Sequence, residues 1–246
     1  MRAVSDGCGC FPTGRHYPGI AHLMRAIARG TAEEFAADLN WDDIPIAMLD
    51  VETTGLESLT DRVIELGIVV GLRGEIVAQG NWMINPGRPI SAESTAVHGI
   101  TDADVADKPA FADVAHEVVK LLSGAVPAAY NAQFDRGFLQ AEFGRSAAKV
   151  PSLPPALRKE VEWLDPLVWA REIHRDEKSR TLVNVAARLG IALENAHRAS
   201  DDAQAALRVL YALGRDARVP RPYGAFVQEQ RRLSMLHDDE RRRWRS

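Results

Sequence analysis

Short apolar runs separated by turn residues recur along the chain and predict the strands of one sheet. They lie at 44–51, 63–72, 75–84, 126–130 and 162–164. The first three follow one another closely, and the Arg73-Gly74 pair is typical of a tight turn, so we expect an antiparallel meander. The last two each precede a helical pattern, which favours parallel additions. The prediction is an α/β fold with a mixed five-stranded sheet flanked by helices.

Helical spacing of apolar residues marks the segments that follow the later strands. Phe134, Phe138 and Phe143 recur at this spacing, and Leu210 and Leu213 lie on the apolar side of an amphipathic pattern near residue 207. Helices are therefore expected to start near residue 134 and shortly before residue 203.

Two further segments flank the predicted sheet. The segment 20–39 has a helical pattern interrupted at Gly30-Thr31, and a second pattern runs from Tyr223 onward. We expect an N-terminal extension at 1–43, a central domain at 44–214 and a charged C-terminal tail at 215–246. The extension is predicted to be a helical hairpin that packs on the domain or engages a partner.

Composition agrees with a globular protein. The chain has 246 residues, of which 46% are hydrophobic and 26% charged, enough for one domain with appendages. No apolar run approaches the roughly 20 residues that cross a bilayer, and the N-terminus lacks the apolar segment of a signal peptide. We expect a cytoplasmic protein that does not contact membranes.

The net charge of −4 is unusual for a protein that binds nucleic acid through its phosphates. The charge is uneven, however, because residues 215–246 contain nine Arg against five Asp or Glu. The central domain is correspondingly acidic. Metal ions would neutralise part of an acidic site. This distribution therefore favours a short contact with a strand end over tight binding of duplex.

An acidic pair ends the first predicted strand. Asp50 and Glu52 are two residues apart, so they share one face of the strand, and Thr53, Thr54 and Gly55 then stop it. Two carboxylates held together in a buried place repel each other unless a cation or a proton lies between them. The alternative is that Asp50 only ends the strand and Glu52 is a solvated loop residue.

Two other segments add further acidic residues and a histidine. Asp135 follows the 126–130 run at the start of a helix, where it would also serve as a helix cap. His197 precedes a second helix and Asp202 lies in its first turns, whereas Asp201 points elsewhere because a helix turns about 100° per residue. A surface histidine beside capping residues is the alternative interpretation here.

Taken in order, these motifs resemble those of the DEDDh-type 3′–5′ exonucleases, the family of the proofreading epsilon subunit of bacterial DNA polymerase III and of ribonuclease T. The matching segments are Asp50-x-Glu52-Thr53-Thr54-Gly55, Asn131-x-x-Phe134-Asp135, His197 with Asp202, and Ala96-Val97-His98-Gly99-Ile100-Thr101. The resemblance covers roughly residues 44–213. It implies a ribonuclease H-like fold and a metal-dependent exonuclease.

The resemblance also implies roles for individual residues. Asp50, Glu52, Asp135 and Asp202 would bind two Mg²⁺ or Mn²⁺ ions, for which hard carboxylate oxygens are suited, and His197 would be the general base. Contacts to the terminal nucleotide would come from the loop after the first strand and from the segments opposite. The residues implied are Thr53, Thr54, Leu56, Val97, His98, Asn131 and Phe134. Phe134 is equally well explained as a core residue, and His98 as part of a turn.

The expected activity is removal of nucleotides from the 3′ end of single-stranded or frayed nucleic acid, with DNA favoured, releasing 5′-monophosphates in proofreading or repair. Alternatives are an exoribonuclease that trims RNA, an enzyme acting on small nucleotides, and a non-catalytic scaffold for a polymerase. Expected partners are single-stranded DNA or RNA 3′ ends and a DNA polymerase. The segment 230–236 loosely resembles a sliding-clamp motif, although a solvated charged helix explains it better.

Three remaining features have structural interpretations. Glu65 is expected to be hydrogen-bonded near the edge of the sheet, and Asp165 before Pro166 to cap a helix. Cys8 and Cys10 have neither the spacing of a common zinc module nor the geometry of a favoured disulfide. They therefore predict no metal centre.

Overall fold

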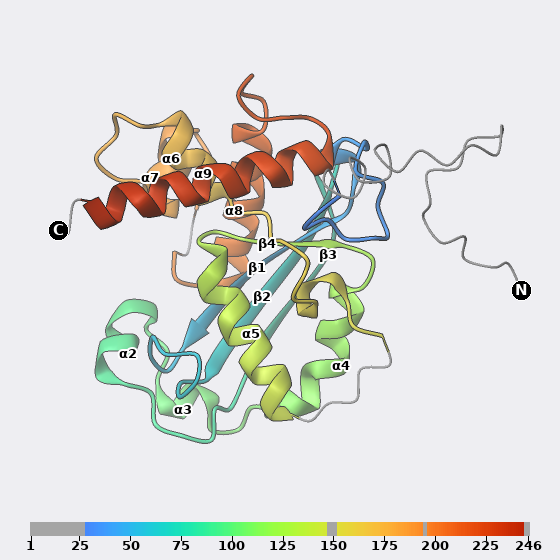
Figure 1. The fold of residues 1–246 in the computed structure, drawn as a ribbon. Coiled ribbons are helices and arrows are strands. Elements are labelled where there is room, and N and C mark those ends of the chain that lie inside the picture. The colour runs from blue at the N-terminus through green and yellow to red at the C-terminus, as the bar shows by residue number, and fades with distance from the viewer. Residues whose placement is uncertain (1–27, 147–151, 194–195, 244–246) are drawn as a thin grey trace, which may run out of the picture.

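The computed structural model describes residues 28–146, 152–193 and 196–243, which form three layers with a sheet between two sets of helices (Figure 1). The sheet has four strands in the order β3-β2-β1-β4. Their bounds are β1 Ile46–Thr53, β2 Val63–Leu72, β3 Glu75–Met83 and β4 Val126–Ala129. This confirms the α/β class and the mixed sheet flanked by helices.

The meander is confirmed. β1 pairs antiparallel with β2, β2 pairs antiparallel with β3, and β4 is parallel to β1. Arg73 and Gly74 both have positive φ, 54° and 87°, as a two-residue turn between twisted antiparallel strands requires. The first strand starts and ends two residues later than the apolar run at 44–51, which leaves both acidic residues inside it.

The predicted fifth strand is wrong. Only Leu164 of the 162–164 run makes a bridge, parallel to Ala128 of β4. On its other side, the backbone groups of Trp163 and Asp165 are paired with the side-chain amide of Gln230. Pro166 then begins a helix directly, so the segment is too short to become a strand.

The helices cover the two faces of the sheet. They are α2 Ala92–His98, α3 Asp102–Val105, α4 Phe111–Leu122, α5 Ala132–Ser146, α6 Pro166–Ile173, α7 Leu182–Arg188, α8 Ala199–Leu213 and α9 Tyr223–Arg243, with short 3-10 turns at Trp41–Asp43 and Pro155–Leu157. Because side chains alternate along β1, Ala47 and Leu49 pack toward α4 and α5, whereas Ile46 and Met48 pack toward α8. No helix in the described ranges is long and apolar enough to cross a membrane.

The described part of the N-terminal extension differs from the predicted helical hairpin. Residues 28–39 form successive turns, because their backbone groups bond to other elements: Tyr223 and Gly224 donate to the carbonyls of Leu39 and Ala37. Trp41 is buried against Phe226, with ring centroids 5.3 Å apart. Packing on the domain is thus confirmed for this segment. Cys8 and Cys10 lie outside the described residues.

The C-terminal tail is helical from Tyr223, as predicted, but it is not a solvated helix. Tyr223, Phe226 and Val227 of α9 have no exposed surface and belong to the same core cluster as Ile46 and Met48 of β1. In Figure 1, α9 crosses the upper end of the molecule as the long red helix. It is therefore an integral part of the fold.

Candidate active site

The site lies at the carboxyl end of β1. Asp50 and Glu52 project from the face that α8 covers, and in the antiparallel register they stand opposite Gly67 and Glu65 of β2. Asp50 is half-buried and Glu52 is 9% exposed. Because β4 pairs with β1 only as far as Leu49, the last residues of β1 have a free edge on that side.

The free edge of β1 receives Asp135. After β4 the chain turns at Asn131, whose φ is 72°, and enters α5, where Asp135 lies in the first turn. Its Oδ1 accepts a hydrogen bond from the backbone N–H of Val51 at 3.2 Å, and the side chain is only 4% exposed. A third carboxylate is thereby held next to Asp50.

α8 brings the fourth carboxylate. Its first residues press directly on β2, because a Cβ at Gly67 would stand 2.3 Å from the carbonyl carbon of Ala199. Glu65 secures the same point: it has no exposed surface, and its oxygens accept hydrogen bonds from Arg198 Nη2 at 3.1 Å and Ala199 N at 3.4 Å. Asp202 therefore points at the end of β1.

His197 and two of the carboxylates converge. Ligand atoms of Glu52, His197 and Asp202 all lie within 4.8 Å of one another, and Asp50 and Asp135 flank this group without belonging to it. His197 adopts a φ of 69°, and its backbone N–H donates to Asp202 Oδ2 at 3.0 Å. The imidazole itself is exposed and so accessible to a water molecule or a substrate.

Burial and mutual repulsion change the acidity of these carboxylates. Desolvation is the main cause for each, and it raises the pKa of Asp50 well above its usual range, with added repulsion from Asp135 and Asp202. The pKa of Glu52 rises to about 7, through burial and then through the charge of Asp202. Burial also raises the pKa values of Asp135 and Asp202.

The residues present fit a divalent cation. Asp202 Oδ1 is buried and, among the described residues, has no hydrogen-bond partner. A buried acceptor without a donor is costly, and a cation in front of it would satisfy it while relieving the repulsion that raises the pKa of Asp50 and Glu52. The carboxylate oxygens are hard donors, the type that Mg²⁺ and Mn²⁺ prefer.

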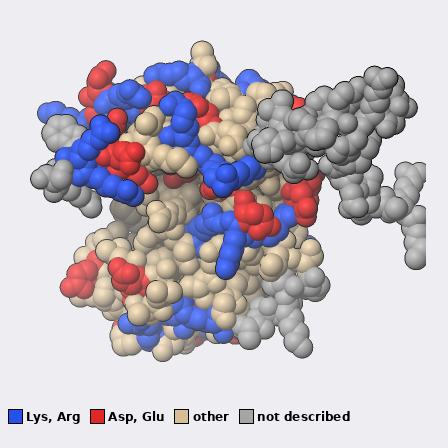
Figure 2. Space-filling view, viewed as in Figure 1, with Lys and Arg blue, Asp and Glu red and all other residues tan. Residues whose placement is uncertain are grey.

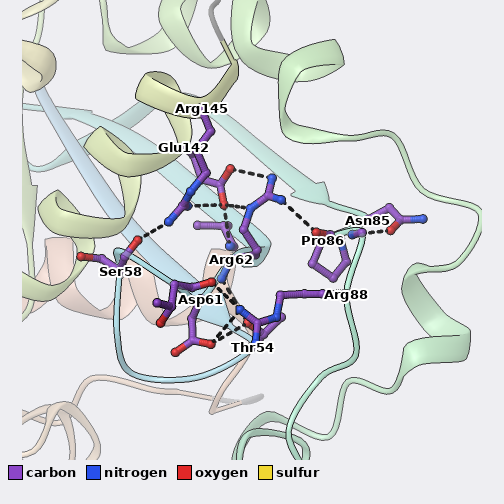
Figure 3. Close-up of polar contacts among 12 residues, drawn as sticks. Thr54, Ser58, Asp61, Arg62, Asn85, Pro86, Arg88, Glu142 and Arg145 are labelled. Atoms are coloured by element: carbon purple, nitrogen blue, oxygen red, sulfur yellow. Dashed lines mark hydrogen bonds and ion pairs between the residues drawn. The ribbon is translucent and has the colours of Figure 1, made fainter.

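The loop 54–62 after β1 is fixed by polar contacts (Figure 3). Asp61 accepts from Thr54 Oγ1 at 3.3 Å and from the N–H of Glu57 at 3.0 Å, so it closes the loop from inside. Gly55 permits this, because a Cβ there would stand 2.4 Å from Asp61 Oδ2. Arg88 donates to the carbonyl of Thr60 from outside.

A buried ion pair anchors the same loop to α5 (Figure 3). Glu142 is 1% exposed and accepts two hydrogen bonds from Arg62, at 2.7 and 3.0 Å, and one from Arg145 at 3.3 Å. Arg145 also donates to the carbonyl of Ser58, and Arg62 to that of Pro86. The loop beside the carboxylates is therefore preorganised.

Three of the predicted substrate contacts, Thr53, Thr54 and His98, have side chains that are already hydrogen-bonded within the protein. Thr53 Oγ1 donates to the carbonyl of Gly55 at 2.6 Å, and Thr54 is bonded to Asp61. His98 is buried, accepts from the N–H of Ile100 at Nδ1 and bonds the carbonyl of Thr53 through Nε2, 3.3 Å away. Burial lowers the pKa of His98, which favours the neutral imidazole. The side chain therefore joins α2 to β1 by a hydrogen bond.

The other predicted contacts are accessible. Leu56 is 80% exposed and Val97 59% exposed. Leu56, Asn131 and Phe134 line a hollow of about 280 Å³ together with Glu57, Ser58, Gln133 and Phe138. The ring of Phe134 also packs against Phe138, with centroids 4.9 Å apart. Phe134 of this hollow directly precedes Asp135 in the first turn of α5.

Comparison with known proteins identifies the family. A family model described as exonuclease, of the RNase T type, matches residues 47–210. The chain belongs to this exonuclease family. All four carboxylates and His197 fall within the matched range, whereas α9 and the segment before β1 lie outside it.

Relatives and solved structures agree with this family. The chain is 33% identical to the PolC-type DNA polymerase III of Streptococcus suis over 181 residues, and 32% identical to that of Streptococcus thermophilus over 202 residues. These matches cover 74% and 82% of this chain but only 12% and 13% of the polymerases. The exonuclease chain thus spans about an eighth of its curated relatives.

Two solved structures share the fold at lower identity. Exonuclease I of E. coli in complex with a dA16 oligonucleotide superposes with a TM-score of 0.61 at 19% identity, covering 75% of this chain and 42% of that one. A 3′-exonuclease with end-specific recognition of a histone mRNA stem-loop superposes at 0.58 with 20% identity, covering 72% and 65%. The nuclease fold is therefore shared with enzymes of both DNA and RNA.

Some residues that build the site gave little signal in the sequence. Glu65 is hydrogen-bonded as predicted, but it lies on an interior strand and fastens α8 through Arg198. Asp165 caps α6 as predicted, and it also accepts from the N–H groups of Asn131 and Ala132. The role of Gly67 depends on a helix that is more than a hundred residues away in the chain.

Proposed function

We propose that this chain is a metal-dependent 3′–5′ exonuclease that removes nucleotides from single-stranded or frayed ends and releases nucleoside 5′-monophosphates. The observation that carries the proposal is the convergence of Glu52, His197 and Asp202 beside Asp50 and Asp135. The buried Oδ1 of Asp202 has no hydrogen-bond partner in the described part of the chain. Membership of the exonuclease family supports the same reaction.

Each residue has a defined task in this proposal. Asp50, Glu52 and Asp202, with Asp135 in support, would hold two Mg²⁺ or Mn²⁺ ions. When bound, such ions polarise the scissile phosphate, promote deprotonation of water and neutralise the leaving oxygen. The exposed imidazole of His197 takes the proton of the attacking water, and its backbone bond to Asp202 keeps it at the site.

Restriction to a strand end follows from the surroundings of the carboxylates. The fixed loop 54–62 carries Leu56 on one side, and Asn131 and Phe134 stand on the other. A terminal nucleotide lying between them would place its phosphate at the acidic end of β1. Val97, exposed on α2, would close the same region.

DNA is the favoured substrate, because the PolC-type relatives are DNA polymerases. A role in proofreading or repair, with a polymerase as partner, follows from the same relatives. An RNA substrate is the second candidate, since one structural neighbour recognises the 3′ end of an mRNA stem-loop. The two polymers present the same scissile phosphate, so the distinction rests on the sugar contacts.

The test uses 5′-labelled single-stranded DNA and RNA of one sequence with Mg²⁺ or Mn²⁺. The expected result is a ladder that shortens from the 3′ end, stronger for DNA, and absent for Asp50→Ala. Glu75→Ala, which changes an exposed carboxylate at the opposite end of β2 and β3, should retain the activity. No cleavage of either polymer by the folded protein, or equal cleavage by Asp50→Ala, would contradict the proposal.

A further inference from the structure

A second hollow lies beside the first, between the start of α5 and α9. Its volume is about 280 Å³, and it is lined among others by Asn131, Gln133, Arg136, Arg171, Gln230 and Ser234. In the space-filling view, the surface is notched between the part that carries α9 and the part that carries α2, and many side chains over α9 are Lys or Arg (Figure 2).

The two hollows are neighbours. Asn131 and Gln133 line both of them, so they form the ridge over which a strand would leave the active site. Both side chains are exposed and have no hydrogen-bond partner among the described residues. Their amide groups are therefore available as donors and acceptors on either side of the ridge.

The turn that bears the ridge is rigid. Asp165 accepts the N–H groups of Asn131 and Ala132 at 3.0 and 3.1 Å, and its own N–H donates to Gln230 Oε1 at 2.8 Å. Gln230 Nε2 in turn donates to the carbonyl of Trp163 at 2.8 Å. α9 is thus attached by hydrogen bonds, through Asp165, to the loop that starts α5.

The second hollow is lined by two arginines and three acidic residues, and of these Arg136 is the cation placed to meet a phosphate. Arg136 lies one helical turn after Gln133; it donates to the carbonyl of Lys159 at 2.9 Å and has no carboxylate partner among the residues described. The three acidic residues of the lining, Glu162, Asp165 and Asp238, are already engaged. Asp165 is saturated by backbone N–H groups, and Glu162 faces Arg231 at 3.4 Å.

We propose that this second hollow is a binding subsite for the nucleotide upstream of the terminal one or two, in a single strand whose 3′ end occupies the active site. Its volume is at the small end of ligand pockets, which suits one nucleotide. The amides of Asn131 and Gln133 contact the base or sugar at the ridge, and Arg136 contacts the following phosphate. The inference rests on the proposed exonuclease function, and it gives α9 a part in substrate binding.

The test fills the hollow from the α9 side. Ser234→Trp places a large ring in the hollow. Met235→Trp is the matched control, because it adds the same side chain at a position that does not line the hollow and is 61% exposed. Oligothymidylates of two to eight nucleotides are hydrolysed with Mg²⁺. We expect KM for hexamers and octamers to rise about tenfold in Ser234→Trp, with kcat and dinucleotide cleavage unchanged, and no effect in Met235→Trp. Arg136→Gln should raise KM for the longer strands in the same way.

Binding in EDTA separates this inference from the proposed function. There the wild-type protein should bind labelled hexamers more tightly than dimers, and Ser234→Trp should remove that difference; thermal melting confirms that each variant is folded. If hydrolysis fails but this difference in binding is found and is lost in Ser234→Trp, the subsite stands and the exonuclease proposal falls. Equal effects on dimers and octamers, or none in either Ser234→Trp or Arg136→Gln, would overturn the subsite.

Discussion

The carboxylates at the end of β1 bind protons more tightly in the folded protein than in the unfolded chain. The clearest case is Glu52, whose pKa rises from 4.5 to about 7 because it is buried near Asp202. Stability that comes from this proton is fully present below pH 4.5 and is lost as the pH rises through about 7. The metal-free protein therefore carries an electrostatic strain at neutral pH.

A melting series tests this strain. In EDTA, Tm should fall as the pH rises from 5 to 7.5, and saturating Mg²⁺ or Mn²⁺ should reduce the fall, because the cation binds the deprotonated carboxylates. Glu52→Gln should flatten the slope in EDTA, whereas Glu57→Gln, on the exposed loop, should keep it. A Tm that rises across this interval without metal would show that the carboxylates do not repel each other.

Single residues of the site were predictable where spacing alone determines what they do. Asp50 and Glu52 share a strand face whatever surrounds them. His98 has the right place in its motif, but its ring bonds the carbonyl of Thr53, a partner that only the packed structure reveals. The same holds for Thr54, whose hydroxyl is used by Asp61.

Among the elements, the contact between α8 and β2 determines where Asp202 lies. Gly67→Ala should destabilise the protein by about 3 kcal/mol and lower kcat sharply, because the new Cβ would overlap the backbone of Ala199 and push α8 away from Asp50. Chemical unfolding and steady-state kinetics measure both effects. Gly144→Ala is the control: nothing lies within 4 Å of a Cβ there, and the helix should gain up to about 1 kcal/mol. Normal activity of Gly67→Ala would mean that the close approach is not required.

The ion pair between the loop 54–62 and α5 should affect substrate binding more than chemistry. Glu142→Gln should cost about 2 kcal/mol, at the low side for a buried pair because Arg62 is partly exposed, and should raise KM for a trinucleotide while kcat changes little. Glu177→Gln, which removes an exposed partner of Arg188, should change neither quantity. A loss confined to kcat would instead place Glu142 in the reaction itself.

At this scale the sequence predicted most of the sheet but overestimated its size. Runs of apolar residues are sufficient to identify β1, β2 and β3, because each pairs over many residues. The run at 162–164 has the same local pattern, yet its outer side is occupied by the side chain of Gln230. The pattern of apolar residues cannot show that Gln230 of α9, 65 residues later, will occupy the outer side of this segment.

For the whole molecule, the core extends well beyond the family boundary. Trp41 and Phe226, from opposite ends of the described chain, pack together over the α8 face of the sheet. Phe226→Ala should therefore destabilise the entire domain by about 4 kcal/mol, whereas Met235→Ala on the same helix should stay within about 0.5 kcal/mol. Urea unfolding monitored by tryptophan fluorescence distinguishes them. A separate, earlier transition for α9 would contradict a single cooperative core.

Gln230 has a consequence for any partner that seeks the C-terminal helix. Gln230 is the glutamine of the segment 230–236, which loosely resembles a sliding-clamp motif. Both polar atoms of its side-chain amide are already hydrogen-bonded, Oε1 to the N–H of Asp165 and Nε2 to the carbonyl of Trp163. Leu233 is buried as well. A protein that captured this glutamine would have to detach α9 from the loop that supports Asn131 and α5. Recruitment through this glutamine would therefore compete with the two hydrogen bonds that join α9 to the loop before α6.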